Sequence, residues 1–242
     1  MPPALEHSHS EQGIRERLAR GPRTNYLRDW IYGGIDGTVT TFAIVAGVAG
    51  AQLSTSVLLL LGFANLVADG FAMAAGNYLG TRAEHDDYQR VLSIERRHIA
   101  MVPEGEREEI RQIFAAKGFA GGDLERAVAV ITADPTLWAE TMATEEYGLS
   151  QTLRSPIMSA LSTFIAFLVC GCVPLLTYLL PSGLAGCVAA TGATFFAVGT
   201  IKSLWSAAHW LRSGAEVLFI GMSAAALAFA VGFGLRAYFG VS

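Results

Sequence analysis

The chain has 242 residues, of which 52% are apolar and 16% are charged, and its formal net charge is −4 at pH 7. A soluble globular protein usually carries about 25% charged residues. Residues 37–68 and 155–201, which are 32 and 47 positions long, contain no Asp, Glu, Lys, Arg or His. Because about 20 apolar residues suffice to cross a bilayer, this distribution of charge excludes a soluble protein.

Residues 1–29 form a polar tail without the apolar stretch of a cleavable signal peptide, so we expect none. Two apolar segments follow at 30–51 and 57–79, and three more at 156–180, 182–204 and 215–235. Backbone groups in lipid must be hydrogen-bonded internally, so each segment is predicted to be a helix. The sequence therefore predicts an all-α polytopic membrane protein, with spans 1–2 in residues 30–81 and spans 3–5 in residues 155–242.

The segment between the second and third spans is of a different kind. Residues 82–154 hold 23 of the 38 charged residues, nine of them basic and 14 acidic. Helices are predicted at 82–101, continuing the second span, and at 104–116, 123–131 and 135–147. Pro103 breaks the first of these and suits the first turn of the next. We expect a soluble, helical insert.

Basic residues set the predicted orientation. Sixteen of the 17 Lys and Arg residues precede the first span, lie in the insert or flank the loop between spans four and five. Cytoplasmic segments of membrane proteins are enriched in Lys and Arg, so the tail and the insert are predicted to be cytoplasmic. Both a bacterial inner membrane and a vacuole-like organelle membrane satisfy this rule. Because the basic residues follow the membrane side, no nucleic-acid binding is expected.

Three acidic residues lie inside the predicted spans: Asp36, Asp69 and Glu216. An ionisable group in a membrane is costly, so it indicates function by default. Glu216 is one turn from the cytoplasmic end of its span, and both a functional and an interfacial interpretation remain open for it. Asp36 and Asp69 are deeper, and we take them as candidate metal or proton sites.

Asp69, Met73 and Asn77 follow one another at i, i+4 and i+8, so they share one face of the second span. Asp36 and Met73 both lie about 9–10 Å from the predicted cytoplasmic end of their spans, at 1.5 Å per residue. A carboxylate, a thioether and an amide oxygen at one depth suit a divalent transition metal. The alternative is that Met73 fills a packing gap between the helices.

The insert carries three pairs of candidate ligands at helical spacing, and each pair falls on a different predicted helix. They are Glu95 with His98, Glu106 with Glu109, and Met142 with Glu146. Carboxylate, imidazole and thioether donors together suit Fe²⁺, Mn²⁺, Co²⁺ or Zn²⁺ better than Ca²⁺ or Mg²⁺. The alternative for any single pair is a solvated helix face.

Two long motifs point to a known family. Residues 34–51 (GIDGTVTTFAIVAGVAGA) resemble the first span of the vacuolar iron transporter family, and residues 65–79 (NLVADGFAMAAGNYL) resemble its second. Five spans with a helical insert after the second are also that family's layout. The resemblance extends from about residue 25 to the end of the chain.

The resemblance implies roles for particular residues. Asp36 and Met73 match the family's membrane ligands, whereas Glu95, Glu106, Glu109, Met142 and Glu146 match the ligands of its metal-binding insert. His98 and Asn77 stand where glutamates are usual, and Asp69 stands where many members have a small residue. The family is dimeric, with an ion path near the two-fold axis, and it exchanges Fe²⁺ for protons. It uses no prosthetic group, since the metal is the substrate.

The sequence therefore predicts a membrane transporter, not an enzyme, that moves Fe²⁺, or else Mn²⁺, out of the cytoplasm in exchange for protons. Such a protein serves metal homeostasis and detoxification. The alternatives are a membrane-anchored metal sensor and a ferritin-like di-iron protein. Glu95-x-x-His98 matches the ferritin-like signature, but such sites need two of these motifs, and the insert offers one.

Overall fold

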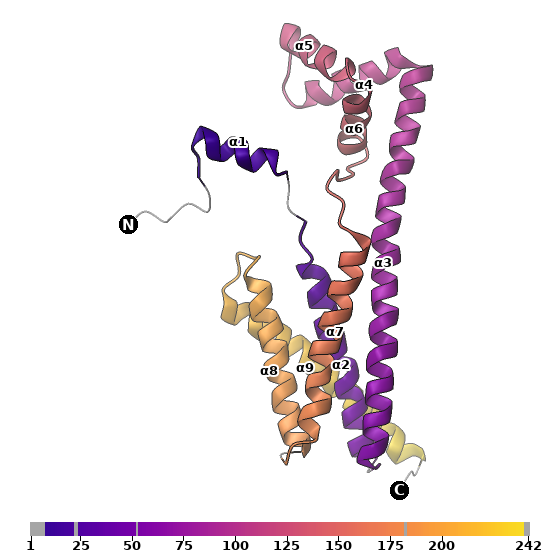
Figure 1. Ribbon diagram of the computed structural model, residues 1–242, viewed down its shortest axis with the longest axis vertical. Helices are drawn as coiled ribbons and strands as arrows, with labels where there is room; N and C mark the ends of the chain where they lie inside the picture. Colours follow the sequence, from indigo (N-terminus) through magenta and orange to yellow (C-terminus); the bar gives the residue numbers. More distant parts are fainter. Residues whose placement is uncertain (1–7, 22–23, 52, 182, 240–242) are drawn as a thin grey trace. The chain divides into compact units, whose positions relative to one another are not determined.

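The computed structural model describes residues 8–21, 24–51, 53–181 and 183–239, and within these ranges every regular element is a helix (Figure 1). The helices are α1 (Glu11–Ala19), α2 (Leu27–Gly50), α3 (Thr55–Met101), α4 (Pro103–Ala116), α5 (Gly121–Thr132), α6 (Pro135–Glu145), α7 (Pro156–Tyr178), α8 (Gly183–Ser203) and α9 (Trp210–Phe239). They divide into two compact units. Asn25–Gly80 with Ser155–Ser242 is called here the membrane unit, and Thr81–Arg154 with Met1–Thr24 the insert unit.

Five helices are long and apolar enough to cross a membrane: α2, α3, α7, α8 and α9. This confirms the all-α prediction with five spans. Their bounds lie close to the predicted ones, and the largest change is in α9, which begins at Trp210 instead of residue 215. Ser182, the predicted first residue of the fourth span, lies outside the described residues.

Proline and capping side chains place the starts of three helices. Pro103, Pro135 and Pro156 each occupy the first turn, where a missing N–H costs no hydrogen bond. Asp134 accepts a hydrogen bond from the Thr136 N–H at 2.8 Å, and Ser155 accepts one from the Met158 N–H at 3.4 Å. These are standard N-caps, and each satisfies a backbone donor that the helix leaves free.

The sequence analysis did not predict α1. Ser10 caps it by accepting from the Gly13 N–H at 3.1 Å, and the ion pairs Arg15–Glu11 and Arg20–Glu16 span single turns. None of its residues is buried. A short helix without an apolar face gives no periodic signal, which is why it was missed.

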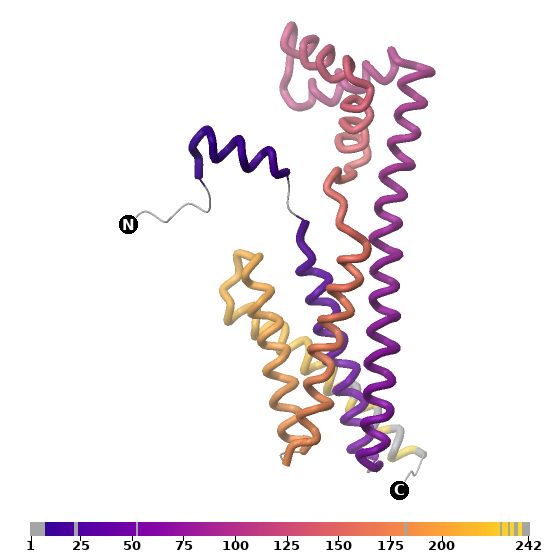
Figure 2. The backbone as a smooth tube through the Cα atoms, viewed as in Figure 1, coloured from indigo at the N-terminus to yellow at the C-terminus, as the bar shows by residue number. Residues whose placement is uncertain are grey.

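Glycines allow α2 and α7 to pack backbone against backbone in the membrane unit, where Figure 2 shows the two helices running alongside each other. A Cβ on Gly33 would collide with the Thr163 carbonyl oxygen, and one on Gly37 with that of Phe167. On the opposing helix, a Cβ on Gly171 would lie 2.8 Å from the Gly37 carbonyl oxygen. Small residues four apart are a recurrent device for close helix packing in lipid.

The insert unit has its own hydrophobic core. One cluster joins the end of α3 to α6 through Tyr88, Val91, Leu92, Ala139 and Ala143. A second cluster joins α4, α5 and α6 through Ile110, Val128, Trp138 and Met142. Ion pairs at the surface supplement this core. One of them joins Arg111 of α4 to Glu125 of α5 at 2.9 Å. Residues 88–92 of α3 and Ile110 of α4 are thereby packed against α6.

We expect Gly37→Ala to destabilise the membrane unit, because the new methyl group would meet the Phe167 carbonyl oxygen, a backbone atom that cannot rotate away. Overpacking of this kind costs about 1–3 kcal/mol. Thermal unfolding of the purified protein in detergent measures the effect. Gly47→Ala is the matched control on the same helix, since its Cβ meets nothing within 4 Å. Equal unfolding temperatures for the two variants would contradict the packing described.

Candidate metal centre

Two acidic residues of the membrane unit lie within electrostatic range of each other. Asp36 on α2 and Asp69 on α3 are both half-buried, and their carboxylates interact electrostatically. Two like charges that are partly removed from water repel each other unless a proton or a cation lies between them. The pair is therefore suited to binding a cation.

Asn77, a predicted ligand, is engaged in helix packing. Its Nδ2 donates to Asp29 Oδ1 at 3.0 Å, to Thr163 Oγ1 at 2.7 Å and to the Ser159 carbonyl oxygen at 3.2 Å. The amide thereby joins α2, α3 and α7. Asp29 is only 2% exposed, and the sequence analysis did not select it because it was assigned to the tail. The available signal was its position seven residues before Asp36, which places both acids on one face of α2.

These contacts also set the register of α2 against α3. Asp29 lies level with Asn77, and Asp36 interacts with Asp69. The two helices run in opposite directions, so half-buried Met73 falls between the two levels, about one turn from each. The expected coordination set is thus spread over more than one turn along α3.

Glu216 has a partner at the end of its helix. Lys202 Nζ donates to Glu216 Oε2 at 3.1 Å, and the Glu216 side chain is 55% exposed. The ion pair joins the last turn of α8 to the beginning of α9. The interfacial interpretation of Glu216 therefore accounts for its position.

The predicted ligands of the insert unit come from three helices whose ends meet. Glu95 and His98 lie in the last two turns of α3, and Glu106 lies in the first turn of α4. Val102 alone separates these helices, so the chain changes direction within a single residue between α3 and α4. Glu146 caps the C-terminus of α6. The first turn of a helix favours negative charge, which suits Glu106.

Three of these side chains converge. Glu95, His98 and Glu106 each offer one ligand atom, and the three atoms lie within 4.8 Å of one another. His98 Nδ1 lies 3.4 Å from Glu106 Oε1. Glu95 is 1% exposed and Glu106 is 6% exposed, whereas His98 is half-buried. The geometry is that of a three-ligand cation site.

Glu95 Oε2 and Glu106 Oε2 are buried and accept no hydrogen bond from any donor group among the described residues, and the two carboxylates lie close enough to share a proton. A buried polar atom left unpaired costs about 1–3 kcal/mol. Their position beside His98 indicates that a cation would satisfy them.

Two further carboxylates act on the cluster through their charge. Burial first, and then the charges of Glu109 and Glu95, raise the pKa of Glu106 to about 7. Loss of hydration and the same two neighbours raise the pKa of Glu146, whereas His98 opposes the rise. Glu109 and Glu146 are exposed. They therefore lie at the solvent side of the cluster, within electrostatic range of it.

Met142 occupies a different environment from the other predicted ligands. It is fully buried and packs with Ile110, Val128 and Trp138 in the apolar core of the insert. The Trp138 ring carries the Arg107 guanidinium at 5.7 Å, and Arg107 is the residue next to Glu106. Met142 therefore packs against α4 through Ile110.

Tyr147 belongs to the cluster although the sequence analysis did not select it. Its hydroxyl donates to Glu95 Oε1 at 3.1 Å. Burial and then the charge of Glu95 raise the pKa of Tyr147 to about 12, so the hydroxyl keeps its proton and remains a donor. No spacing rule marks a tyrosine that directly follows a candidate ligand, Glu146.

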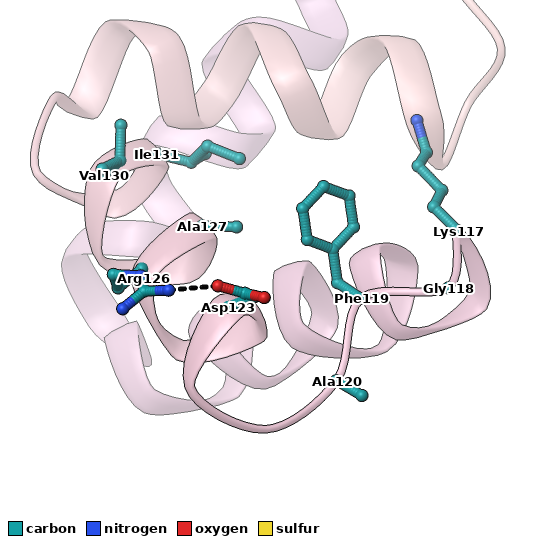
Figure 3. Close-up of a pocket in the computed structure, with 9 residues that line it drawn as sticks. All are labelled: Lys117, Gly118, Phe119, Ala120, Asp123, Arg126, Ala127, Val130 and Ile131. Atoms are coloured by element: carbon teal, nitrogen blue, oxygen red, sulfur yellow. Dashed lines mark hydrogen bonds and ion pairs between the residues drawn. The ribbon is translucent and has the colours of Figure 1, made fainter.

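A cavity of about 590 Å³ opens elsewhere in the insert unit, between the end of α4 and α5 (Figure 3). Its lining includes Phe119, Val130 and Ile131, and its charged groups are engaged in ion pairs. Asp123 pairs with Arg126, and Lys117 pairs with Glu145. The cavity holds none of the predicted ligands.

The chain matches the model of the VIT family over residues 27–233. It is 35% identical over 208 residues to vacuolar iron transporter 1 of Arabidopsis thaliana, and this aligned region covers 84% of this chain and 83% of the relative. It is 30% identical over 231 residues to vacuolar iron transporter 1 of Oryza sativa subsp. japonica, covering 93% and 90%. A vacuolar iron transporter of Plasmodium berghei is 25% identical over 240 residues.

The family model spans most of the chain, including both motifs quoted above and the insert between them. The chain, an integral membrane protein, belongs to the VIT family.

Proposed function

We propose that this protein transports Fe²⁺ out of the cytoplasm, that Mn²⁺ is a second substrate, and that protons move in exchange. The observation that carries the metal substrate in this proposal is the cluster of the insert unit. Glu95, His98 and Glu106 converge there, and two buried carboxylate oxygens have no partner. The insert would capture the metal and raise its concentration at the membrane unit. Relatives named as vacuolar iron transporters support iron as the substrate.

The proposed direction of transport is supported by the placement of charge. With 16 of 17 Lys and Arg residues on the side of the insert, the positive-inside rule assigns that side to the cytoplasm. A metal-collecting unit on that side implies export, across a bacterial inner membrane or into a vacuole-like organelle. Family resemblance extends the proposal to a homodimer.

Proton exchange is proposed from the membrane acids. Two carboxylates near each other in an apolar setting repel unless a cation compensates their charge, so we propose that a proton occupies the Asp36 and Asp69 pair whenever no metal is bound. A metal entering between them would displace that proton, and its departure would allow a proton to return. The Asn77 network would hold α2, α3 and α7 in register during this cycle.

A metal sensor or a ferritin-like di-iron protein without transport would account for the insert unit alone. Neither would need interacting acids within apolar helices. For this reason Asp36 and Asp69 favour transport over both alternatives.

We expect Asp36→Asn to abolish transport, because the amide preserves the size of the side chain and removes its charge. The measurement is Fe²⁺ uptake into vesicles reconstituted with the purified protein, with and without a pH gradient. The wild type should show gradient-dependent uptake, and the variant should match protein-free vesicles.

Glu216→Gln is the matched control for this experiment. It also removes one acid from an apolar helix, but from an exposed ion pair with Lys202. Uptake by this variant should equal that of the wild type. Normal transport by Asp36→Asn would show that the proposed ion path is wrong.

The stability of the insert unit is expected to depend on pH. Glu106 has a pKa of about 7 in the folded chain, against an ordinary value of 4.5. Between these values the folded state holds a proton that the unfolded state has lost. The free energy of local unfolding of the metal-free protein should therefore fall as the pH rises from about 4.5 to 7, and level off above. Hydrogen exchange of α4 amides, corrected for intrinsic pH dependence, measures it.

Glu106→Gln should remove most of this pH dependence, and at pH 8 it should slow exchange in α4 relative to the wild type. Glu108→Gln is the control on the same helix. Hydrogen bonds from Gln112 and Arg111 lower the pKa of Glu108, so its loss should not flatten the profile between pH 4.5 and 7. Parallel profiles for the wild type and Glu106→Gln would contradict the assignment.

A further inference from the structure

The insert site of this chain is a mixed nitrogen and oxygen site. His98 supplies an imidazole nitrogen to this site. The two other converging residues, Glu95 and Glu106, supply carboxylate oxygens. Its Nδ1 lies 3.4 Å from Glu106 Oε1, so the ring faces the cluster. The nitrogen atom is therefore placed to bind the same cation as the two carboxylates.

Tyr147 restricts what Glu95 can offer that cation. Its hydroxyl occupies Glu95 Oε1 at 3.1 Å, and Oε2 remains buried without a partner. A carboxylate with one oxygen engaged in this way presents its other oxygen as a single donor. Glu106 Oε2 is likewise unpartnered. The site thus provides one nitrogen, from half-buried His98, and a small number of buried oxygens.

The chemistry of these donors discriminates between metals. Imidazole suits Fe²⁺, Co²⁺ and Zn²⁺, whereas Mn²⁺, Mg²⁺ and Ca²⁺ prefer oxygen ligands. Ca²⁺ in addition takes six to eight oxygens, more than this buried set supplies. The exposed Glu109 and Glu146 add negative charge, which attracts every cation, and Met142 is packed in the apolar core. Within the part of the chain that the structure describes, His98 supplies the only nitrogen of this converging group.

We infer that His98 is the specificity-determining ligand of the insert, favouring Fe²⁺, Co²⁺ and Zn²⁺ over Mn²⁺, and that Tyr147 is a positioning residue that holds Glu95 as a single-oxygen donor. The inference rests on the proposed function, since it assumes that the insert binds the transported metal. It goes beyond the proposed function by naming the residue that makes the insert bind some divalent metals more tightly than others.

The test for His98 compares Co²⁺, a redox-stable substitute for Fe²⁺, with Mn²⁺. Each metal is titrated calorimetrically into the metal-free, full-length protein in detergent. In His98→Glu, the ratio of Co²⁺ to Mn²⁺ affinity should fall by about tenfold or more, and the visible absorption of bound Co²⁺ should change because a nitrogen ligand is lost. His98→Gln, which adds no charge, should also lose more Co²⁺ affinity than Mn²⁺ affinity.

His85→Glu is the matched control for His98→Glu. His85 is also on α3, but its Nε2 hydrogen-bonds to the Arg154 carbonyl oxygen at 2.7 Å. The affinity ratio should stay at the wild-type value in this variant. An unchanged ratio in His98→Glu, with both metals still bound, overturns the role of His98 and leaves the proposed metal capture standing. A wild type that binds neither metal overturns both.

The test for Tyr147 uses Tyr147→Phe, which removes only the hydroxyl. Loss of a partner that orients a metal ligand typically lowers affinity by about 10–100-fold, and we expect a loss of this size for both metals. The absorption of bound Co²⁺ should shift as well, which a general loss of packing would not produce. Tyr88→Phe is the control, because Tyr88 lies in the separate apolar cluster of α3 and α6. Wild-type affinities and an unshifted spectrum in Tyr147→Phe overturn its positioning role.

Discussion

A carboxylate removed from water must be compensated by a proton, a cation or hydrogen bonds, and both candidate sites of this protein depend on that constraint. In the insert unit, Glu95 and Glu106 are nearly inaccessible, and the compensation is incomplete, since each keeps one unpartnered oxygen. In the membrane unit, the interacting Asp36 and Asp69 meet the same constraint in a more apolar setting. A site whose buried negative charge is not fully compensated favours the binding of a cation.

The packing of helices in the membrane unit holds the backbone around the acidic residues in place. Gly33 and Gly37 bring α2 against the backbone of α7, and Asp36 lies between them on the same helix. Asn77 joins both helices to α3 through three hydrogen bonds. The glycines and the amide thus fix the backbone from which the acidic side chains project. Polar contacts and close approach substitute here for the hydrophobic effect, which gives no net attraction between helices in lipid.

The spans and the helices of the insert follow from the sequence because their signals are strong. Long runs without charge define the spans, and Pro103 and Pro135 define two helix starts. Helical spacing and family resemblance together selected Glu95, His98 and Glu106, which the structure brings together. These patterns depend on one helix at a time, which is why they can be read from the chain.

Features that depend on contacts between helices could not be predicted in this way. Asp29 looked like part of a tail, and its burial arises from Asn77 and Thr163 on two other helices. Tyr147 reaches Glu95 from 52 residues away in the sequence. Met142 has the right spacing for a ligand, yet its helix turns it into the apolar core. In each case the side chain's role is set by a partner that no local pattern reveals.

The burial of Trp138 has a practical consequence. Its indole ring lies under the Arg107 guanidinium, one residue from Glu106, and packs against Met142. The other three tryptophans, Trp30, Trp205 and Trp210, belong to the membrane unit. A natural fluorophore thus contacts the residue that directly follows Glu106, a member of the carboxylate cluster. Once the other three are replaced, its emission would report occupancy of the insert optically, without an attached dye and separately from events in the membrane.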